Sequence, residues 1–265
     1  MPIRCPISIR PISDGEFQQI DRLVMGCAFA SQNELGRLAD ERVYENDVAN
    51  RLRAVGFVDV QTQVPVVAEW RGFSKEYRLD LVAGQMVYEL KTVAAFTATH
   101  ESQVFNYAAL LEIDRIKLIN FRPAKVQGRL KRCPFRETNR RGISVDTARF
   151  RRVSPRCAEL IEAAESMLRD WGGFLDATLY REGLTFALGG PDTCERRVPV
   201  MRAGVELGTH RVDFHHDECA FIVTTLNQNR QAHETHLRRL MNLLPLKAWQ
   251  WLNIDRTHLT ATTLT

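Results

Sequence analysis

Three charged residues in the first half of the chain are spaced so that their side chains can meet. Glu89 and Lys91 are two residues apart in a β-rich segment, so they point to the same face of a strand. Asp80 closes the preceding β-rich segment, on the other side of a tight turn. Two carboxylates at one sheet edge suit Mg²⁺ or Mn²⁺, with water ligands left for a substrate phosphate. We therefore expect Asp80 and Glu89 to bind the metal, and Lys91 to orient a water or to offset charge in the transition state.

A predicted helix after this strand carries a second polar group. Gln103 and Tyr107 are four residues apart, which puts them on one helix face with His100. Beside the carboxylates they would support the site; alternatively, Gln103 belongs to a polar helix surface and Tyr107 is simply buried. We expect His100 to cap or pack rather than to bind a metal, because it recurs as His233 where no site is expected.

The elements that must position these residues can be predicted from the apolar spacing. In chain order the patterns predict helices over 16–35 and 40–55, strands over 58–67, 76–82 and 86–90, a helix over 99–111 and a strand over 115–121. Gly36 and Gly56 lie where the first two helices should end, the turn 83–85 should make a hairpin, and Thr99 is the expected cap of the third helix. The order α-α-β-β-β-α-β indicates a mixed α/β fold.

The second half of the chain repeats the first at a nearly constant offset of 133 to 136 residues. The recurring residues include Asp80 as Asp213, His100 as His233, Asn120 as Asn253, Gly36 as Gly172 and Tyr44 as Tyr180. The charged set does not recur, because the second copy replaces Glu89 by Ile222, Lys91 by Thr224 and Gln103 by His236. This pattern predicts a tandem duplication in which the first copy alone carries a chemical site.

Together these residues resemble the PD-(D/E)XK nuclease superfamily, whose pattern is an acid on an early helix followed by Asp, Glu-x-Lys and Gln-x-x-x-Tyr. Within it, the first copy is similar to the small bacterial GxxExxY proteins over about residues 16–131. The matching stretches are 24–28, 34–36, 41–45, 63–66, 77–81, 88–91 and 118–121. Two positions depart from that family: Leu38 stands where it has glycine, and Gln32 where it often has histidine.

The resemblance implies a fold and a set of roles. The implied fold is α/β, a restriction-endonuclease-like mixed sheet flanked by helices, here tandemly duplicated. The implied roles are helix acid and metal ligand for Glu45, metal ligands for Asp80 and Glu89, catalytic lysine for Lys91, and supporting motif for Gln103 and Tyr107.

The length of the chain agrees with the repeat. A chain of 265 residues predicts about two domains. We expect a nuclease-like domain with an intact site over 1–131, a basic linker over 132–153 and a degenerate pseudo-nuclease repeat over 154–265.

Positive charge is concentrated where the two copies join. Residues 122–156 hold twelve Lys or Arg, although the net charge of the whole chain is only +4. Basic side chains gain affinity for nucleic acid by releasing counterions from phosphates. We expect Lys131, Arg132, Arg140 and Arg141 to make such contacts; the alternative is a solvated linker without that role.

Several classes of protein are disfavoured. No apolar run approaches the ~20 residues of a membrane span, and the start of the chain lacks the apolar stretch of a signal peptide. Six scattered cysteines without a Cys-x-x-Cys pair disfavour a zinc site and suit a reducing cytoplasm. The absence of Gly-x-x-x-x-Gly-Lys and Gly-x-Ser-x-Gly motifs argues against ATP hydrolysis and against a serine nucleophile.

We therefore expect a Mg²⁺-dependent nuclease that hydrolyses phosphodiester bonds with its first copy only, DNA being the expected substrate. The second copy would be an inactive pseudo-subunit in an intramolecular pseudo-dimer, where it packs or also holds substrate. The rival is a non-catalytic nucleic-acid-binding or regulatory protein with a remnant site. An intact first set beside an eroded second set favours the enzyme.

Overall fold

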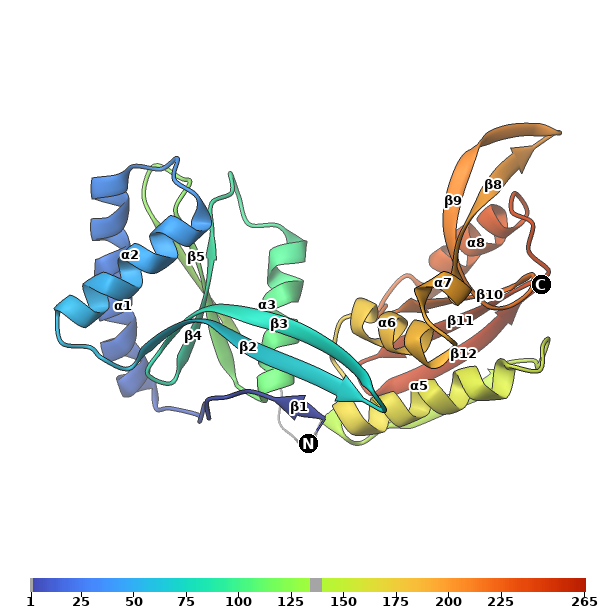
Figure 1. The fold of residues 1–265 in the computed structure, drawn as a ribbon, viewed down its shortest axis with the longest axis horizontal. Coiled ribbons are helices and arrows are strands. Elements are labelled where there is room, and N and C mark those ends of the chain that lie inside the picture. The colour runs from blue at the N-terminus through green and yellow to red at the C-terminus, as the bar shows by residue number, and fades with distance from the viewer. Residues whose placement is uncertain (1, 134–139) are drawn as a thin grey trace. The chain divides into compact units, whose positions relative to one another are not determined.

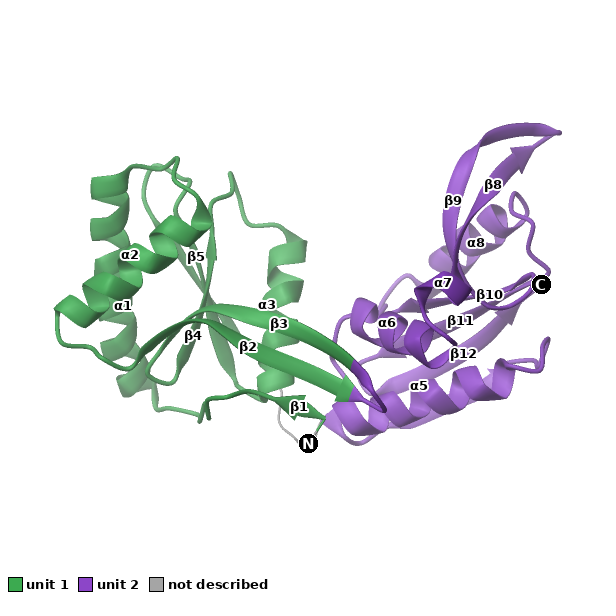
Figure 2. Ribbon diagram, viewed as in Figure 1, with its two compact units in different colours: residues 1–69, 74–137 green, residues 70–73, 138–265 purple. Residues whose placement is uncertain are grey.

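The computed structural model describes residues 2–133 and 140–265, which form two compact units (Figures 1 and 2). Unit 1 comprises residues 1–69 and 74–137, and unit 2 comprises residues 70–73 and 138–265. In the described part of the chain, no helix is both long and apolar enough to cross a membrane.

Unit 1 is built on a six-stranded mixed sheet. Its strands, in spatial order, are β1 (Ile3–Arg4), β2 (Val60–Trp70), β3 (Phe73–Ala83), β4 (Met86–Lys91), β5 (Arg115–Asn120) and β6 (Gln127–Arg132). Its helices are α1 (Asp14–Leu35), α2 (Glu41–Ala54) and α3 (Ala98–Leu111). The helix α3 connects the parallel strands β4 and β5, as a parallel pair requires. Figure 1 shows α1 and α2 on one side of this sheet and α3 on the other.

Unit 2 repeats this plan. Its helices are α5 (Cys157–Trp171), α6 (Ala177–Ala187), α7 (Pro191–Cys194) and α8 (Arg230–Met241). Its strands, in spatial order, are β7 (Ser144–Arg149), β12 (His258–Leu264), β11 (Ala248–Asp255), β10 (Cys219–Thr224), β9 (Val205–His216) and β8 (Glu195–Arg202). The helix α8 connects the parallel strands β10 and β11, as α3 connects β4 and β5. The sheets differ at their edges, since β1 pairs with β2 whereas β7 pairs with β12.

Equivalent side chains make equivalent contacts in the two units. The Tyr44 hydroxyl donates to the carbonyl of Gly36 at 2.6 Å, and the Tyr180 hydroxyl donates to that of Gly172 at 2.5 Å. Both glycines end their helix in the left-handed region, with φ of 74° and 79°. The two sheet-containing halves therefore fit the predicted tandem duplication, and the predicted mixed α/β architecture is confirmed.

Another shared contact fixes the loop after the site-bearing strand. The Asn120 side chain accepts from the amide of Val93 at 3.1 Å and donates to its carbonyl at 2.7 Å. Asn253 does the same for Leu226, at 2.8 and 2.9 Å. The repeat of Asn120 at Asn253 therefore reflects a structural role that both copies need.

The expected cap of α3 was wrong by two residues. The N-cap is Thr97, and the Nδ1 atom of His100 accepts a hydrogen bond from the Thr97 amide at 3.0 Å. The Thr97 side chain in turn accepts from the backbone amide of His100. Such a capping box satisfies amides at the start of a helix. His100 therefore has the capping role that was one of its two expected structural roles.

The segment expected to be a linker, 132–153, is partly a strand. Residues 144–149 form β7, which pairs in parallel with β12, and residues 134–139 lie outside the described residues. The strand escaped prediction because an exposed edge strand carries polar side chains and shows no apolar alternation.

Candidate active site

The structure brings Asp80, Glu89 and Lys91 together on β3 and β4. These strands pair as far as Leu81 and Tyr88. Beyond that pair, the Oδ2 atom of Asp80 accepts a hydrogen bond from the Leu90 amide at 2.8 Å. The Asp80 side chain thus takes the place of a backbone carbonyl as the acceptor for the Leu90 amide. This hydrogen bond anchors Asp80 rigidly beside β4.

The ammonium of Lys91 lies among three carboxylates. Its Nζ atom is 2.6 Å from Glu89 Oε1, 3.4 Å from Glu41 Oε1 and 3.8 Å from Asp80 Oδ2. It also donates to the carbonyl of Leu90 at 2.8 Å. Burial alone would lower the pKa of Lys91, but the three carboxylates outweigh it and the pKa is raised. Lys91 is therefore a charged donor and does not accept a proton here.

The carboxyl of Glu89 is the most deeply buried acid of this group. The residue is 1% exposed, and its Oε2 atom has no hydrogen-bond partner among the described residues. Burial, followed by the charge of Asp80, raises the pKa of Glu89 to about 8. The pKa of Asp80 is also raised, chiefly by burial and against the attraction of Lys91. Burial thus disfavours the ionised forms of both carboxyls, and a bound cation would stabilise those forms.

The predicted helix acid, Glu45, reaches this group through an intermediary. Its Oε2 atom accepts from the Gln63 amide at 2.7 Å, and the same Gln63 nitrogen lies 3.5 Å from Asp80 Oδ1. Arg42 binds the other oxygen of Glu45 at 2.6 Å. The described residues contain no group of three or more His, Cys, Asp or Glu side chains arranged to hold a metal ion. Glu45 thus reaches Asp80 through Gln63, and the ligand roles expected of Asp80 and Glu89 stay predictions.

Two residues of the site were missed by sequence reasoning. Glu41 lies one helical turn before Glu45 and contacts Lys91, whereas Gln63 joins Glu45 to Asp80. Gln63 has a φ of 52°, a backbone conformation that a side-chain-bearing residue adopts at a cost of order 1–3 kcal/mol. A usable signal existed for both, because the stretches 41–45 and 63–66 are among those that suggested the resemblance to the GxxExxY proteins.

The supporting pair on α3 is formed. Gln103 Nε2 donates to the Tyr107 hydroxyl at 3.0 Å, and Tyr107 is 6% exposed. Burial, followed by the charge of Glu89, raises the pKa of Tyr107 to about 12. The phenol is thus neutral and within electrostatic reach of the carboxylates, while Gln103 holds its orientation.

The counterpart of the site in unit 2 is chemically different. Asp213 is retained, but Arg181 stands 136 residues after Glu45 and lies 3.5 Å from Asp213 and 3.2 Å from Glu195. Thr224, at the position of Lys91, donates to Asn253 at 2.6 Å. An internal guanidinium therefore sits where unit 1 has a buried carboxylate.

Each of the four expected nucleic-acid-binding residues has an interaction partner inside the protein. Lys131 lies 2.6 Å from Glu101, and Arg132 lies 3.6 Å from Asp14. The prediction for Arg140 was wrong: the residue is 1% exposed and donates to the carbonyls of Trp171 and Gly173 at 2.6 and 3.2 Å. Charge counting missed this because it does not show which acids and carbonyls the fold brings close.

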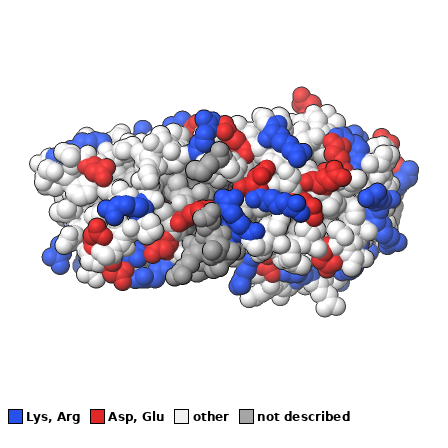
Figure 3. All heavy atoms as spheres, turned by 90° about the horizontal axis from the view of Figure 1, so that it is seen from below, with Lys and Arg blue, Asp and Glu red and all other residues white. Residues whose placement is uncertain are grey.

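Arg141 is exposed, so its expected role stays a prediction. On the face drawn in Figure 3, basic and acidic side chains are interspersed.

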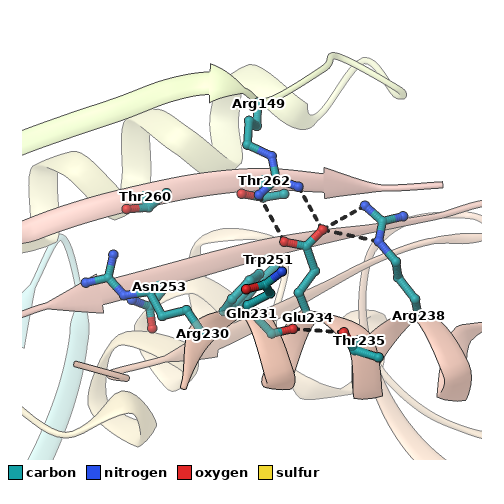
Figure 4. A pocket seen from close by; sticks show the side chains of 10 residues that line it. All are labelled: Arg149, Arg230, Gln231, Glu234, Thr235, Arg238, Trp251, Asn253, Thr260 and Thr262. Carbon is teal, nitrogen blue, oxygen red and sulfur yellow. Dashed lines mark hydrogen bonds and ion pairs between the residues drawn. The ribbon is translucent and has the colours of Figure 1, made fainter. Parts of the chain in front are cut away.

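A polar hollow of about 530 Å³ lies in unit 2 between α8 and the strands β11, β12 and β7 (Figure 4). Arg149 and Arg238 meet at Glu234, at 2.7 and 2.9 Å, and Arg230 pairs with Asp255. Each of these arginines is paired with an acid, although Arg149 and Arg238 share Glu234. Unit 1 has the same kind of cluster around Glu101, 133 residues before Glu234, so this one is best explained as structural.

Comparison with known proteins gives one match, over the site-bearing part of the chain. No curated protein and no solved structure matches the chain. The family model of the PD-(D/E)XK nuclease superfamily matches residues 18–133, which include every residue of the candidate site. Members of this superfamily are typically nucleases that use divalent metal ions. By its matched residues and its strand order, unit 1 has the PD-(D/E)XK nuclease fold.

Proposed function

We propose that unit 1 is a metal-dependent nuclease that hydrolyses phosphodiester bonds in nucleic acid, with DNA as the expected substrate, and that unit 2 is an inactive repeat. The observation that carries this proposal is the buried, unpartnered Oε2 atom of Glu89 beside Asp80 and Lys91. A buried carboxylate oxygen without a donor is costly unless a cation binds it.

The donor set fits Mg²⁺ or Mn²⁺. Asp80 and Glu89 would hold the ion, with water completing the shell, since Mg²⁺ commonly uses one or two carboxylates. When bound, such an ion lowers the pKa of a coordinated water and polarises a phosphate oxygen. Glu45 is assigned a positioning role instead of the expected ligand role, because it contacts Asp80 only through Gln63.

The remaining residues supply positive charge and order. Lys91 is protonated and can donate to a phosphate oxygen, where it offsets the negative charge that grows in the transition state. Glu41 holds that ammonium from the helix side at 3.4 Å. Tyr107, fixed by Gln103, closes the site from α3 with a neutral hydroxyl.

The rival function, non-catalytic nucleic-acid binding or regulation, is disfavoured by the contrast with unit 2. There a site without chemistry has replaced a carboxylate by Arg181, which balances Asp213 internally. In unit 1 the carboxylates remain, and Lys91 is one cation shared by Asp80 and Glu89. The similarity to GxxExxY proteins in particular stays a prediction.

The test is cleavage of duplex and single-stranded DNA and RNA by the purified chain with Mg²⁺ or Mn²⁺. We expect cleavage that EDTA stops and that Asp80→Asn and Lys91→Ala reduce by about 10²-fold or more. The matched control is Asp213→Asn, the same change at the equivalent position of unit 2, which should retain cleavage. Equal activity in wild type and Lys91→Ala would refute the proposal.

A further inference from the structure

Unit 2 contains an occupied docking groove between α5 and α6. Its occupant is the tip of the β2–β3 hairpin, residues 70–73, which belongs to unit 2. Trp70 donates to Ser166 at 3.1 Å and is 5% exposed. The Phe73 ring lies 5.9 Å from that of Trp171 and 5.8 Å from that of Phe186. A hairpin tip with an aromatic anchor thus fills a hollow between two helices.

Unit 1 has the equivalent groove, and it is open. The helices α1 and α2 correspond to α5 and α6 at an offset of 136, so Cys27 and Ala30 stand where Ala163 and Ser166 line the filled groove. A hollow of about 450 Å³ is present there. Its apolar lining consists of Leu23, Gly26, Cys27, Ala30, Ala54 and Val55. Leu23 is 42% and Val55 63% exposed, which is unusual for apolar side chains that line one hollow.

Unit 2 also has the equivalent hairpin, and its tip is uncovered. The turn at Ala203 and Gly204 has φ values of 49° and 80°, like the 43° and 92° of Arg71 and Gly72. This equivalence places Val205 where the first hairpin has its anchor, Phe73. We call residues 201–207 the arm. Figure 1 shows the β8–β9 ribbon extending beyond the rest of unit 2.

The arm is apolar where a docking element should be. Val205 is 61% exposed, Leu207 60% and Met201 38%. A two-stranded ribbon gains little stability from apolar side chains that stay in water, so their presence indicates a partner surface.

We propose that the arm of one chain docks in the α1–α2 groove of a second copy of this chain, with Val205 as its anchor. Each chain offers one arm and one groove, so a reciprocal pair can satisfy both and close as a dimer. This inference goes beyond the nuclease proposal and does not depend on it. If both hold, the assembly carries two Asp80–Glu89–Lys91 sites.

The experiment compares oligomeric states of the full chain by sedimentation velocity over a range of concentrations. Wild type should dimerise. The arm variant Val205→Asp/Leu207→Asp and the groove variant Leu23→Asp should each weaken self-association by about tenfold or more. The control is Val58→Asp, at a residue that is 82% exposed and outside the groove, which should dimerise like wild type. All substitutions are at exposed positions, and circular dichroism checks their folding.

A mixing experiment then separates docking between chains from docking within one. The arm variant keeps an intact groove, and the groove variant keeps an intact arm, so a mixture can form one complete contact. Differently tagged variants should co-purify as mixed pairs although neither pairs with itself. A monomeric wild type, a dimer that both variants leave intact, or variants that do not associate on mixing would each overturn the proposal.

Discussion

Arg181 and Asp213 form an ion pair at 3.5 Å at the positions that Glu45 and Asp80 occupy in unit 1. The aspartate common to both units, Asp80 or Asp213, therefore has different neighbours in each unit. In unit 2 an internal guanidinium balances it, whereas in unit 1 a second carboxylate approaches it through Gln63. If unit 2 is the inactive repeat that we propose, it needs no open cation site, and the arginine stabilises the acids in place of a cation.

Removal of this guanidinium should destabilise unit 2. In Arg181→Met, Asp213 and Glu195 lose the cation that lies within 3.5 Å of both. Because Arg181 is 23% exposed, we expect a loss of about 1–2 kcal/mol, less than for a fully buried pair. Urea denaturation measures the change. Arg169→Met, at an arginine that is 64% exposed, is the control; an equal effect in both variants would contradict the assignment.

The buried Glu89 should make the metal-free protein less stable as pH rises. Its pKa is about 8 when folded and near 4.5 when unfolded, so the folded state binds more protons between these values. The unfolding free energy should therefore fall as pH rises from about 4.5 to 8. Glu89→Gln should remove this slope and raise the stability at pH 8 by roughly 1–3 kcal/mol, while abolishing Mg²⁺ binding.

Thermal denaturation in EDTA across this pH range, with and without the substitution, measures the effect. The matched control is Ile222→Val, at the equivalent position of unit 2, which should keep the wild-type slope. A slope that persists unchanged in Glu89→Gln would show that other groups cause it.

A buried histidine in unit 2 should give the opposite dependence. His215 is 1% exposed, with Ser154 at 3.2 Å, and burial lowers its pKa to about 4. A depressed pKa means that its contribution to stability is complete above about 6.5 and is lost as pH falls toward 4. His215→Asn should flatten the loss of stability between these values, whereas His210→Asn, at an exposed residue, should not. Denaturant titrations at several pH values test this.

The fold and the centre of the site could be predicted because both depend on local spacing. Strand periodicity places Glu89 and Lys91 on one face, and a two-residue turn brings Asp80 opposite them. The features that could not be predicted from the sequence depend on contacts between residues far apart in the chain. Gln63, whose amide nitrogen lies 3.5 Å from Asp80, departs from regular strand geometry with a φ of 52°. Arg140 counts as one more basic residue in a charged stretch, although the fold buries it against two carbonyls.

Gln63 should be a positioning residue whose loss affects metal affinity more than folding. Its amide is the link between Glu45 and Asp80, at 2.7 and 3.5 Å, so Gln63→Ala leaves both carboxylates without their shared donor. Residues that orient metal ligands typically contribute 10- to 100-fold to affinity, and we expect a loss of about that size in Mg²⁺ or Mn²⁺ binding by calorimetry. Gln63→Glu should lower the metal affinity further than Gln63→Ala, because it adds a third negative charge where a donor is needed.

The matched control is Arg197→Ala, at the equivalent strand position of unit 2, where the side chain donates to Thr209 at 3.1 Å. That variant should bind metal like wild type. If Gln63→Ala also binds metal with wild-type affinity, the contact between Gln63 and Asp80 does not position the ligand, and Glu45 has no part in the site.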